Sequence, residues 1–334
     1  MLLNFVLNNF SIMKKNNVFN NQTKGIFQNL STQKALFIVL FICCLFPFIS
    51  PPLALLLGLF TALFIGHPYL HLNHKATHIL LQFSVVGLGF GMNAGTALKA
   101  GKEGFIFTVI SIFSVLILGY IFEKVLKINK VTSFLISVGT AICGGSAIAA
   151  VSPVINAKEK QISVALGTIF ILNSIALIIF PIIGHRLNLS QSQFGLWCAI
   201  AIQDTSSVVG AASKFGNEAL QIATTVKLTR ALWIIPIAFF SSIAFKSKNS
   251  KIKIPYFIGL FVIAILLNTY IPFFQGIGSY IVKGSKIGMT LTLFLIGAGL
   301  SKEVLLSVGF KPILQGVILW ILIAIPSLLA ILYL

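Results

Sequence analysis

Residues 140–156 read Thr140-Ala-Ile-Cys-Gly-Gly-Ser-Ala-Ile-Ala-Ala-Val-Ser-Pro-Val-Ile-Asn156, and long apolar runs lie on both sides. A helix in lipid keeps its backbone groups bonded internally, because hydrocarbon offers them no partner. The adjacent Gly144 and Gly145, flanked by Cys143 and Ser146, favour an opening of the helix at this point. Opened backbone at membrane depth occurs where it is buried in protein or lines a cavity. The stretch therefore predicts the substrate site of a transporter.

The composition predicts a membrane protein. Hydrophobic residues make up 57% of the 334 residues and charged residues only 9%. The excess recurs in runs close to the ~20 apolar residues that span a bilayer. We expect an all-α polytopic membrane protein with 10–11 transmembrane helices over residues 34–334, in which helices are discontinuous near residues 143–146 and 203–207. Residues 1–33 are polar and rich in asparagine, which predicts a mostly disordered cytoplasmic tail. The sequence leaves open whether Met1 or Met13 is the true start.

The basic residues predict orientation rather than a nucleic-acid partner. The net charge is +18, but the lysines lie mostly in short loops, where they determine the topology of a membrane protein. The asymmetry places the N-terminus in the cytoplasm. In the eleven-helix arrangement residues 132–157 and 192–213 each cross the bilayer. Lys130 and Lys158 then lie on opposite sides.

An internal similarity predicts an inverted repeat. Residues 88–101 read LGFGMNAGTALKAG, and they align without gaps on residues 296–309, IGAGLSKEVLLSVG. The two copies run in opposite directions in the eleven-helix arrangement. Secondary transporters commonly contain inverted repeats and place the substrate at the repeat interface. The alternative is that small residues recur wherever membrane helices pack closely.

A second polar cluster surrounds Asp204, the only aspartate in the chain. A charge at bilayer depth costs at least ~2.5 kcal/mol on insertion scales, so it is usually paired or functional. The cluster suits a proton or sodium site, a gate or part of the substrate site. The alternative is a helix cap near the membrane surface. Asn173, in an earlier span, is included here, although it also suits a bond to a neighbouring helix. The other candidate residues for ion coupling or gating are Gln203, Thr205, Ser206 and Ser207.

Two cations lie deep within one apolar segment. Lys227 and Arg230 are three residues apart, which places both on one face of a helix. They lie ~15 Å along the segment at 1.5 Å per residue. Arg230 offers a planar fork suited to an oxyanion. The pair predicts anion binding, and the alternative is that one cation neutralises Asp204.

The sequence contains no pattern typical of an enzyme. It has no nucleophile–base pair, no phosphate-binding Gly-Lys motif and no paired carboxylates. The four cysteines lack metal or disulfide spacing. We therefore expect no catalysis, no cofactor and no metal site. The cysteines are Cys43, Cys44, Cys143 and Cys198.

Four motifs together resemble the YeiH-type family of bacterial inner-membrane proteins, which are named as sulfate exporters. The resemblance implies kinship with the cation–proton antiporter and anion transporter group, in which helices are discontinuous and cross. It also implies sulfate or a related sulfur oxyanion as substrate. Many relatives have His before the acidic residue, where this chain has Gln203, so proton coupling through that His is not available here. The motifs are Cys143-Gly-Gly-Ser-Ala-Ile-Ala-Ala, Pro153-Val-Ile-Asn-Ala, Gln203-Asp-Thr-Ser-Ser-Val-Val-Gly-Ala-Ala and Lys227-Leu-Thr-Arg.

The combined prediction is a secondary transporter that moves a small anion by alternating access. Residues 143–146 would contact the anion, and Lys227 with Arg230 would neutralise its charge. Asp204 would bind a coupling proton or sodium ion. The first alternative is a cation–proton antiporter that uses Asp204, and a receptor or scaffold without transport is the second. The sequence leaves a homodimer open.

Overall fold

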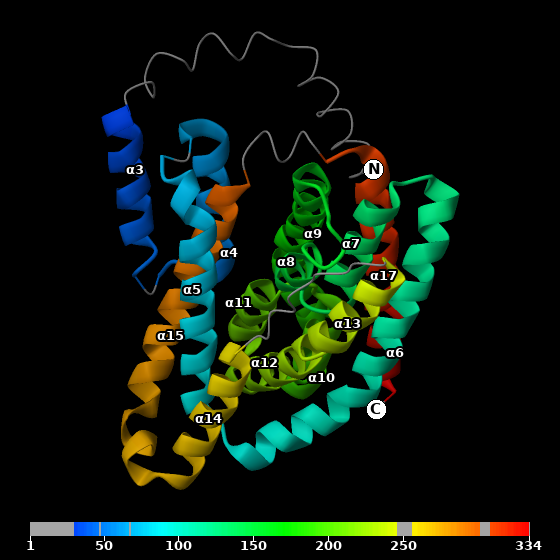
Figure 1. Cartoon of the computed structure of the whole chain (residues 1–334). Coiled ribbons are helices and arrows are strands. Elements are labelled where there is room, and N and C mark those ends of the chain that lie inside the picture. The colour runs from blue at the N-terminus through cyan, green and yellow to red at the C-terminus, as the bar shows by residue number, and fades with distance from the viewer. Residues whose placement is uncertain (1–29, 47, 67, 246–255, 301–307, 334) are drawn as a thin grey trace.

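The computed structural model shows an all-α polytopic membrane protein (Figure 1). It describes residues 30–333 apart from 47, 67, 246–255 and 301–307, and within these ranges all regular structure is helical. Most of the predicted tail, residues 1–29, lies outside the described residues. The first described helix, α3 (Leu30–Cys43), begins inside the segment expected to be tail.

The described residues contain fewer long apolar helices than the 10–11 crossings that the sequence predicts. Among the described residues, five helices are long and apolar enough to span a membrane, and a bent pair, 75–91 with 94–102, makes a sixth. Three shorter apolar helices, Thr32–Cys43, Pro51–Ile65 and Tyr256–Tyr270, accompany them. The expected 10–11 crossings included residues 132–157 and 192–213, and the structure shows that each of these segments turns back. The five long helices are Gly104–Leu126, Glu159–Arg186, Asn217–Ala244, Pro272–Gly299 and Phe310–Leu332.

The first returning segment, hairpin 1, consists of α7 (Lys130–Ala141) and α8 (Gly145–Val151). Its legs lie side by side, because a Cβ atom on Gly139 would meet the Ile148 side chain at 2.9 Å. Its two ends lie together as well. Gln161 Nε2, at the start of α9 (Glu159–Arg186), donates to Asn129 Oδ1 at 2.8 Å. Lys130 and Lys158 are therefore at the same end of α9, which corrects the predicted arrangement.

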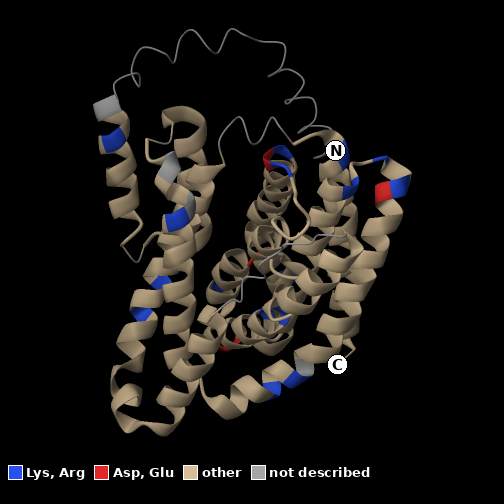
Figure 2. Ribbon diagram, in the orientation of Figure 1, with Lys and Arg blue, Asp and Glu red and all other residues tan. Residues whose placement is uncertain are grey.

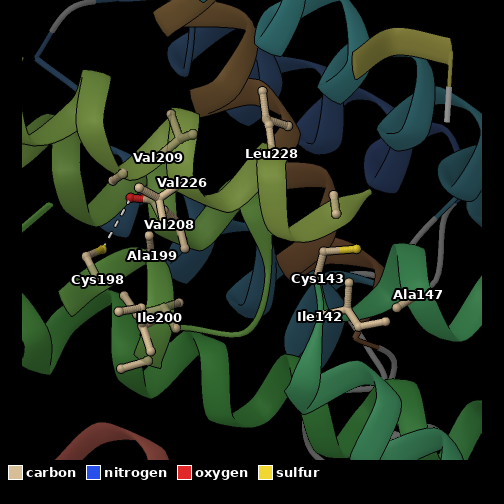
Figure 3. Close-up of a cluster of buried hydrophobic side chains, with 14 of the residues drawn as sticks. Ile142, Cys143, Ala147, Cys198, Ala199, Ile200, Val208, Val209, Val226 and Leu228 are labelled. Carbon is tan, nitrogen blue, oxygen red and sulfur yellow. Dashed lines mark hydrogen bonds between the residues drawn. The ribbon is translucent and has the colours of Figure 1, made fainter. Parts of the chain in front are cut away.

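The second returning segment, hairpin 2, enters from the other end of α9. It consists of α10 (Gln191–Ala201) and α11 (Thr205–Phe215), and Cys198 Sγ bonds to the Val208 carbonyl across it at 3.6 Å (Figure 3). The Phe215 ring stacks on His185, near the end of α9, with centroids 4.4 Å apart. At the start of α12 (Asn217–Ala231), the Glu218 N–H donates to Gln191 Oε1 at 3.0 Å. Hairpin 2 thus also begins and ends on one side.

The remaining helices pack around these hairpins. α12 continues into α13 (Ile234–Ala244), and α6 (Ala94–Leu126) and α17 (Phe310–Leu332) flank hairpin 1. A separate group contains α3, α4, α5, α14 and α15 (Figure 1). Glycines allow close helix contact there, since a Cβ atom on Gly58 would overlap the Phe294 carbonyl oxygen. This group comprises, besides α3, α4 (Pro51–Phe60) with η1 (Thr61–Ile65), α5 (Leu70–Leu88) with η2 (Gly89–Gly91), α14 (Tyr256–Tyr270) and α15 (Pro272–Gly299).

The two copies of the predicted repeat begin at opposite ends of an antiparallel helix pair. Asn73 Nδ2, in α5, donates to the Leu295 carbonyl of α15 at 3.0 Å, and Gly87 packs against Ser285. The end of α5 and the end of α15 therefore point in opposite directions, as the alignment predicts. Residues 301–307 of the second copy lie outside the described residues, and the repeat itself stays a prediction.

Candidate functional site

The tips of the two hairpins meet beside the middle of α9. Asn173 Oδ1 accepts hydrogen bonds from the backbone N–H groups of Gln203 at 3.1 Å and Asp204 at 3.2 Å. Gln203 Nε2 in turn donates to Thr140 Oγ1 of hairpin 1 at 3.3 Å. One amide on α9 and one in hairpin 2 thus join three segments that lie far apart in the sequence.

Gly144 permits this close approach. Its φ of +64° is in the region that side chains other than glycine rarely adopt. A Cβ atom at this position would lie 3.1 Å from Asp204 Cβ. The opening predicted at the paired glycines is confirmed, because α7 ends at Ala141 and α8 begins at Gly145.

Asp204 caps the N-terminus of α11 at the junction. Its Oδ2 atom accepts from the N–H groups of Ser206 at 3.0 Å and Ser207 at 3.4 Å, and also from the Ser206 hydroxyl. Oδ1 receives no hydrogen bond from the described residues. The side chain is a cap, but it lies buried between the hairpins, with 5% of the residue exposed, rather than at a membrane surface. One carboxylate oxygen is left for a ligand.

Both buried cations contact the carbonyl ends of half-helices. Arg230 donates from Nε to the Ala141 carbonyl at 2.5 Å and from Nη1 to the Ile200 carbonyl at 3.0 Å. Lys227 Nζ donates to the Ile202 carbonyl at 2.6 Å. The last carbonyls of a helix lack partners within it and carry partial negative charge, which cations stabilise. Longer bonds run from Arg230 Nη2 to the Thr140 carbonyl (3.5 Å) and from Lys227 Nζ to the Ala199 carbonyl (3.4 Å).

The cations do not pair with Asp204. In the described part of the chain neither Lys227 nor Arg230 lies within the 4.0 Å ion-pair distance of the Asp204 carboxylate. Figure 2 shows that most charged residues lie near helix ends, with few among the central helices. Two fully buried cations and one buried carboxylate therefore leave an excess of positive charge at the hairpin junction.

Two polar atoms at the junction have no partner among the described residues. Asn173 Nδ2 is a buried donor and Gln203 Oε1 a buried acceptor, and neither makes a hydrogen bond in that part of the chain. Buried polar groups are nearly always hydrogen-bonded, so each such atom requires an explanation. A bound ion, substrate or water at the hairpin tips would supply the missing partners.

The structure brings most of the predicted residues together, but not all of them face the junction. Gly144, Asn173, Gln203, Asp204 and the two cations lie there. Gly145 faces Phe170 of α9, at 3.2 Å from a Cβ atom built on it, and Ser146 is half-exposed. Sequence reasoning did not assign a role to Thr140 or to the backbone carbonyls. Thr140 begins the glycine stretch, and only its hydroxyl could have suggested a contact. Cys143 is buried beside the break (Figure 3), and Thr205, Ser206 and Ser207 form the first turn of α11.

Comparison with known proteins identifies the family. The family model described as "Conserved hypothetical protein 698" matches residues 44–316. A UPF0324 membrane protein of Bacteroides thetaiotaomicron is 56% identical over 284 residues, which is 84% of this chain and 86% of the relative. The chain belongs to the UPF0324 membrane protein family. A family member from Photobacterium profundum is 51% identical over 302 residues, 90% of this chain and 92% of that protein. No solved structure matches the chain.

Proposed function

We propose that this member of the UPF0324 family is a secondary transporter that works by alternating access. The observation that carries the proposal is the meeting of two opposed hairpins at a buried junction with an unpartnered donor and an unpartnered acceptor. Interrupted helices whose ends face a site near the bilayer midplane are typical of secondary transporters. Each hairpin reaches the junction from a different end of α9, so movement on either side could open the site to that side.

The substrate that we propose is a small anion, with sulfate or a related sulfur oxyanion as the first candidate. The excess positive charge at the junction supports this proposal. A guanidinium has five N–H donors and an ammonium has three, and Arg230 and Lys227 use only part of them on carbonyls. Asn173 Nδ2 adds a free donor. Of the predicted residues 143–146, Gly144 faces the junction and would lie beside the anion. Gly145, which faces Phe170, and the partly exposed Ser146 are not part of the proposed contact.

We infer that Asp204 binds the coupling proton or sodium ion, while Ser206 and Ser207 hold its carboxylate. The orientation we propose has the N-terminal end in the cytoplasm of a bacterium, with the protein in the inner membrane. Placing Lys158 and Lys160 at the end that holds Lys130 increases the basic excess on that side. Arg186, at the far end of α9, moves to the other side.

Cation–proton antiport is the second candidate function. The observation in its favour is that Asp204 Oδ1 and Gln203 Oε1 both lack donors among the described residues. A carboxylate and an amide oxygen are ligands of hard cations and of protons. In this case Lys227 and Arg230 would only stabilise the half-helices.

Reconstituted flux distinguishes these functions. We expect proteoliposomes loaded with unlabelled sulfate or thiosulfate to accumulate the same labelled anion by counterflow, compared with protein-free liposomes. A proton flux that is driven by a sodium or potassium gradient, and that needs no permeant anion, would favour cation–proton antiport over anion transport as the function. If neither flux exceeds that of empty liposomes for any of the anions and cations tested, the transport proposal is wrong.

A further inference from the structure

A basic cleft lies away from the hairpin junction, where α7, α9 and α17 begin. It has a volume of about 420 Å³, within the range of small-ligand pockets. Its polar lining comprises Asn129, Thr132, Lys158, Lys160, Gln161 and Lys311. We refer to these residues as the basic cleft.

The charges that line the basic cleft all favour an anion. Lys158, Lys160 and Lys311 contribute three ammonium groups, and no lining residue is acidic. Among the described residues, none of the three lysines forms an ion pair. The nearby Glu123 pairs with Lys124 at 3.7 Å. The positive ends of three helices also lie at this point, because α7, α9 and α17 start at residues 130, 159 and 310.

Thr132 gives independent support for a ligand. Only 5% of this residue is exposed, yet it lines the cleft and its hydroxyl makes no hydrogen bond within the described part of the chain. The side-chain oxygen of Asn129, by contrast, already has three donors. This Oδ1 atom accepts from the N–H groups of Val131 and Thr132 and from Gln161 Nε2. The cleft thus presents one free hydroxyl and three free ammonium groups to the same space.

We propose that the basic cleft binds a phosphate-bearing group with more than one negative charge, supplied by the headgroup of an anionic phospholipid that carries two phosphates or by a free phosphorylated solute. Several lysines around one concave site suit a group with several anionic oxygens, each of which takes charge-assisted hydrogen bonds. Basic pockets between membrane helices bind anionic headgroups in the same way. The bound group would link the end of hairpin 1 that lies away from the junction to α9 and α17.

Thermal unfolding of the full-length protein tests this inference. The lipid arm compares nanodiscs of phosphatidylcholine with and without diphosphatidylglycerol, and the soluble arm adds inorganic pyrophosphate to protein in neutral detergent. Ligands that bind the folded state raise its Tm. We expect diphosphatidylglycerol to raise the Tm of the wild type. In Lys160→Gln/Lys311→Gln the apparent affinity should fall at least about tenfold, from the loss of two charge-assisted bonds.

The control removes the same charge elsewhere. Lys102→Gln/Lys214→Gln changes exposed lysines on α6 and α11 and should respond like the wild type. Thr132→Val should weaken the response while leaving the charge unchanged. A response in the lipid arm alone assigns the site to a lipid headgroup, and a response in both arms includes free phosphates. Equal responses of the cleft and control variants, or no response in either arm, would overturn the proposal.

Discussion

Arg230→Met should unfold at a much lower temperature than the wild type. The guanidinium joins the carbonyl end of α7, at Ala141, to that of α10, at Ile200. Methionine fills similar space but leaves these buried carbonyls without donors, at about 1–3 kcal/mol for each unsatisfied group. The two hairpins would also lose the α12 side chain that bonds to both of them. We expect a loss of stability on the order of 3 kcal/mol or more, measured as thermal unfolding in detergent.

Two further variants show whether the guanidinium itself is responsible. Arg186→Met removes an exposed arginine from the last turn of α9 and should leave the unfolding temperature almost unchanged. Arg230→Lys keeps the charge but lacks a planar fork that can reach both hairpins, so its stability should be intermediate. If Arg230→Met unfolds at the same temperature as Arg186→Met, the two hairpins do not depend on this side chain.

Asp204→Asn should strongly reduce coupled flux while the protein stays folded. Asparagine is as good an N-cap as aspartate, so its amide oxygen retains the bonds from the Ser206 and Ser207 N–H groups. The substitution removes only the negative charge of Asp204, which we propose binds the coupling ion. A charged hydrogen bond contributes about 1.5–3 kcal/mol. Each 1.4 kcal/mol is a factor of ten, so proteoliposome flux should fall at least about tenfold.

The matched control for this variant is Glu123→Gln. It neutralises another buried carboxylate, which pairs with Lys124 outside the hairpin junction. Its flux should equal that of the wild type. Unchanged flux and unchanged ion dependence in Asp204→Asn would remove Asp204 from the proposed mechanism, whichever substrate is transported.

The sequence was sufficient to locate the breaks in the helices but not the direction of the chain after them. Adjacent glycines predicted the opening before α8, and hydroxyl residues around Asp204 predicted a polar start for α11. Apolar runs 132–157 and 192–213 are equally compatible with crossing or returning, because hydropathy reports length and polarity only. The return depends on contacts such as Gln161 with Asn129, which are distant in sequence.

The partners of the two cations were also beyond sequence reasoning. The spacing of Lys227 and Arg230 correctly placed both on one face of α12, and the structure shows that this face meets the hairpins. Their hydrogen-bond acceptors are backbone carbonyls, and these become available only where a helix ends. No side-chain pattern marks such a carbonyl. The excess positive charge at the junction therefore became visible only once the ends of α7 and α10 were located.

Side-specific labelling tests most directly whether hairpin 1 returns to the side from which it enters. In a background without Cys43, Cys44, Cys143 and Cys198, single cysteines would replace Lys130, Lys158 or Lys214. A membrane-impermeant maleimide would then be applied to right-side-out and to inverted vesicles. Labelling of Lys130→Cys and Lys158→Cys in the same vesicles, and of Lys214→Cys only in the opposite ones, is the predicted result. Labelling of Lys130→Cys and Lys158→Cys from opposite sides would show that the segment crosses the membrane and would contradict the account.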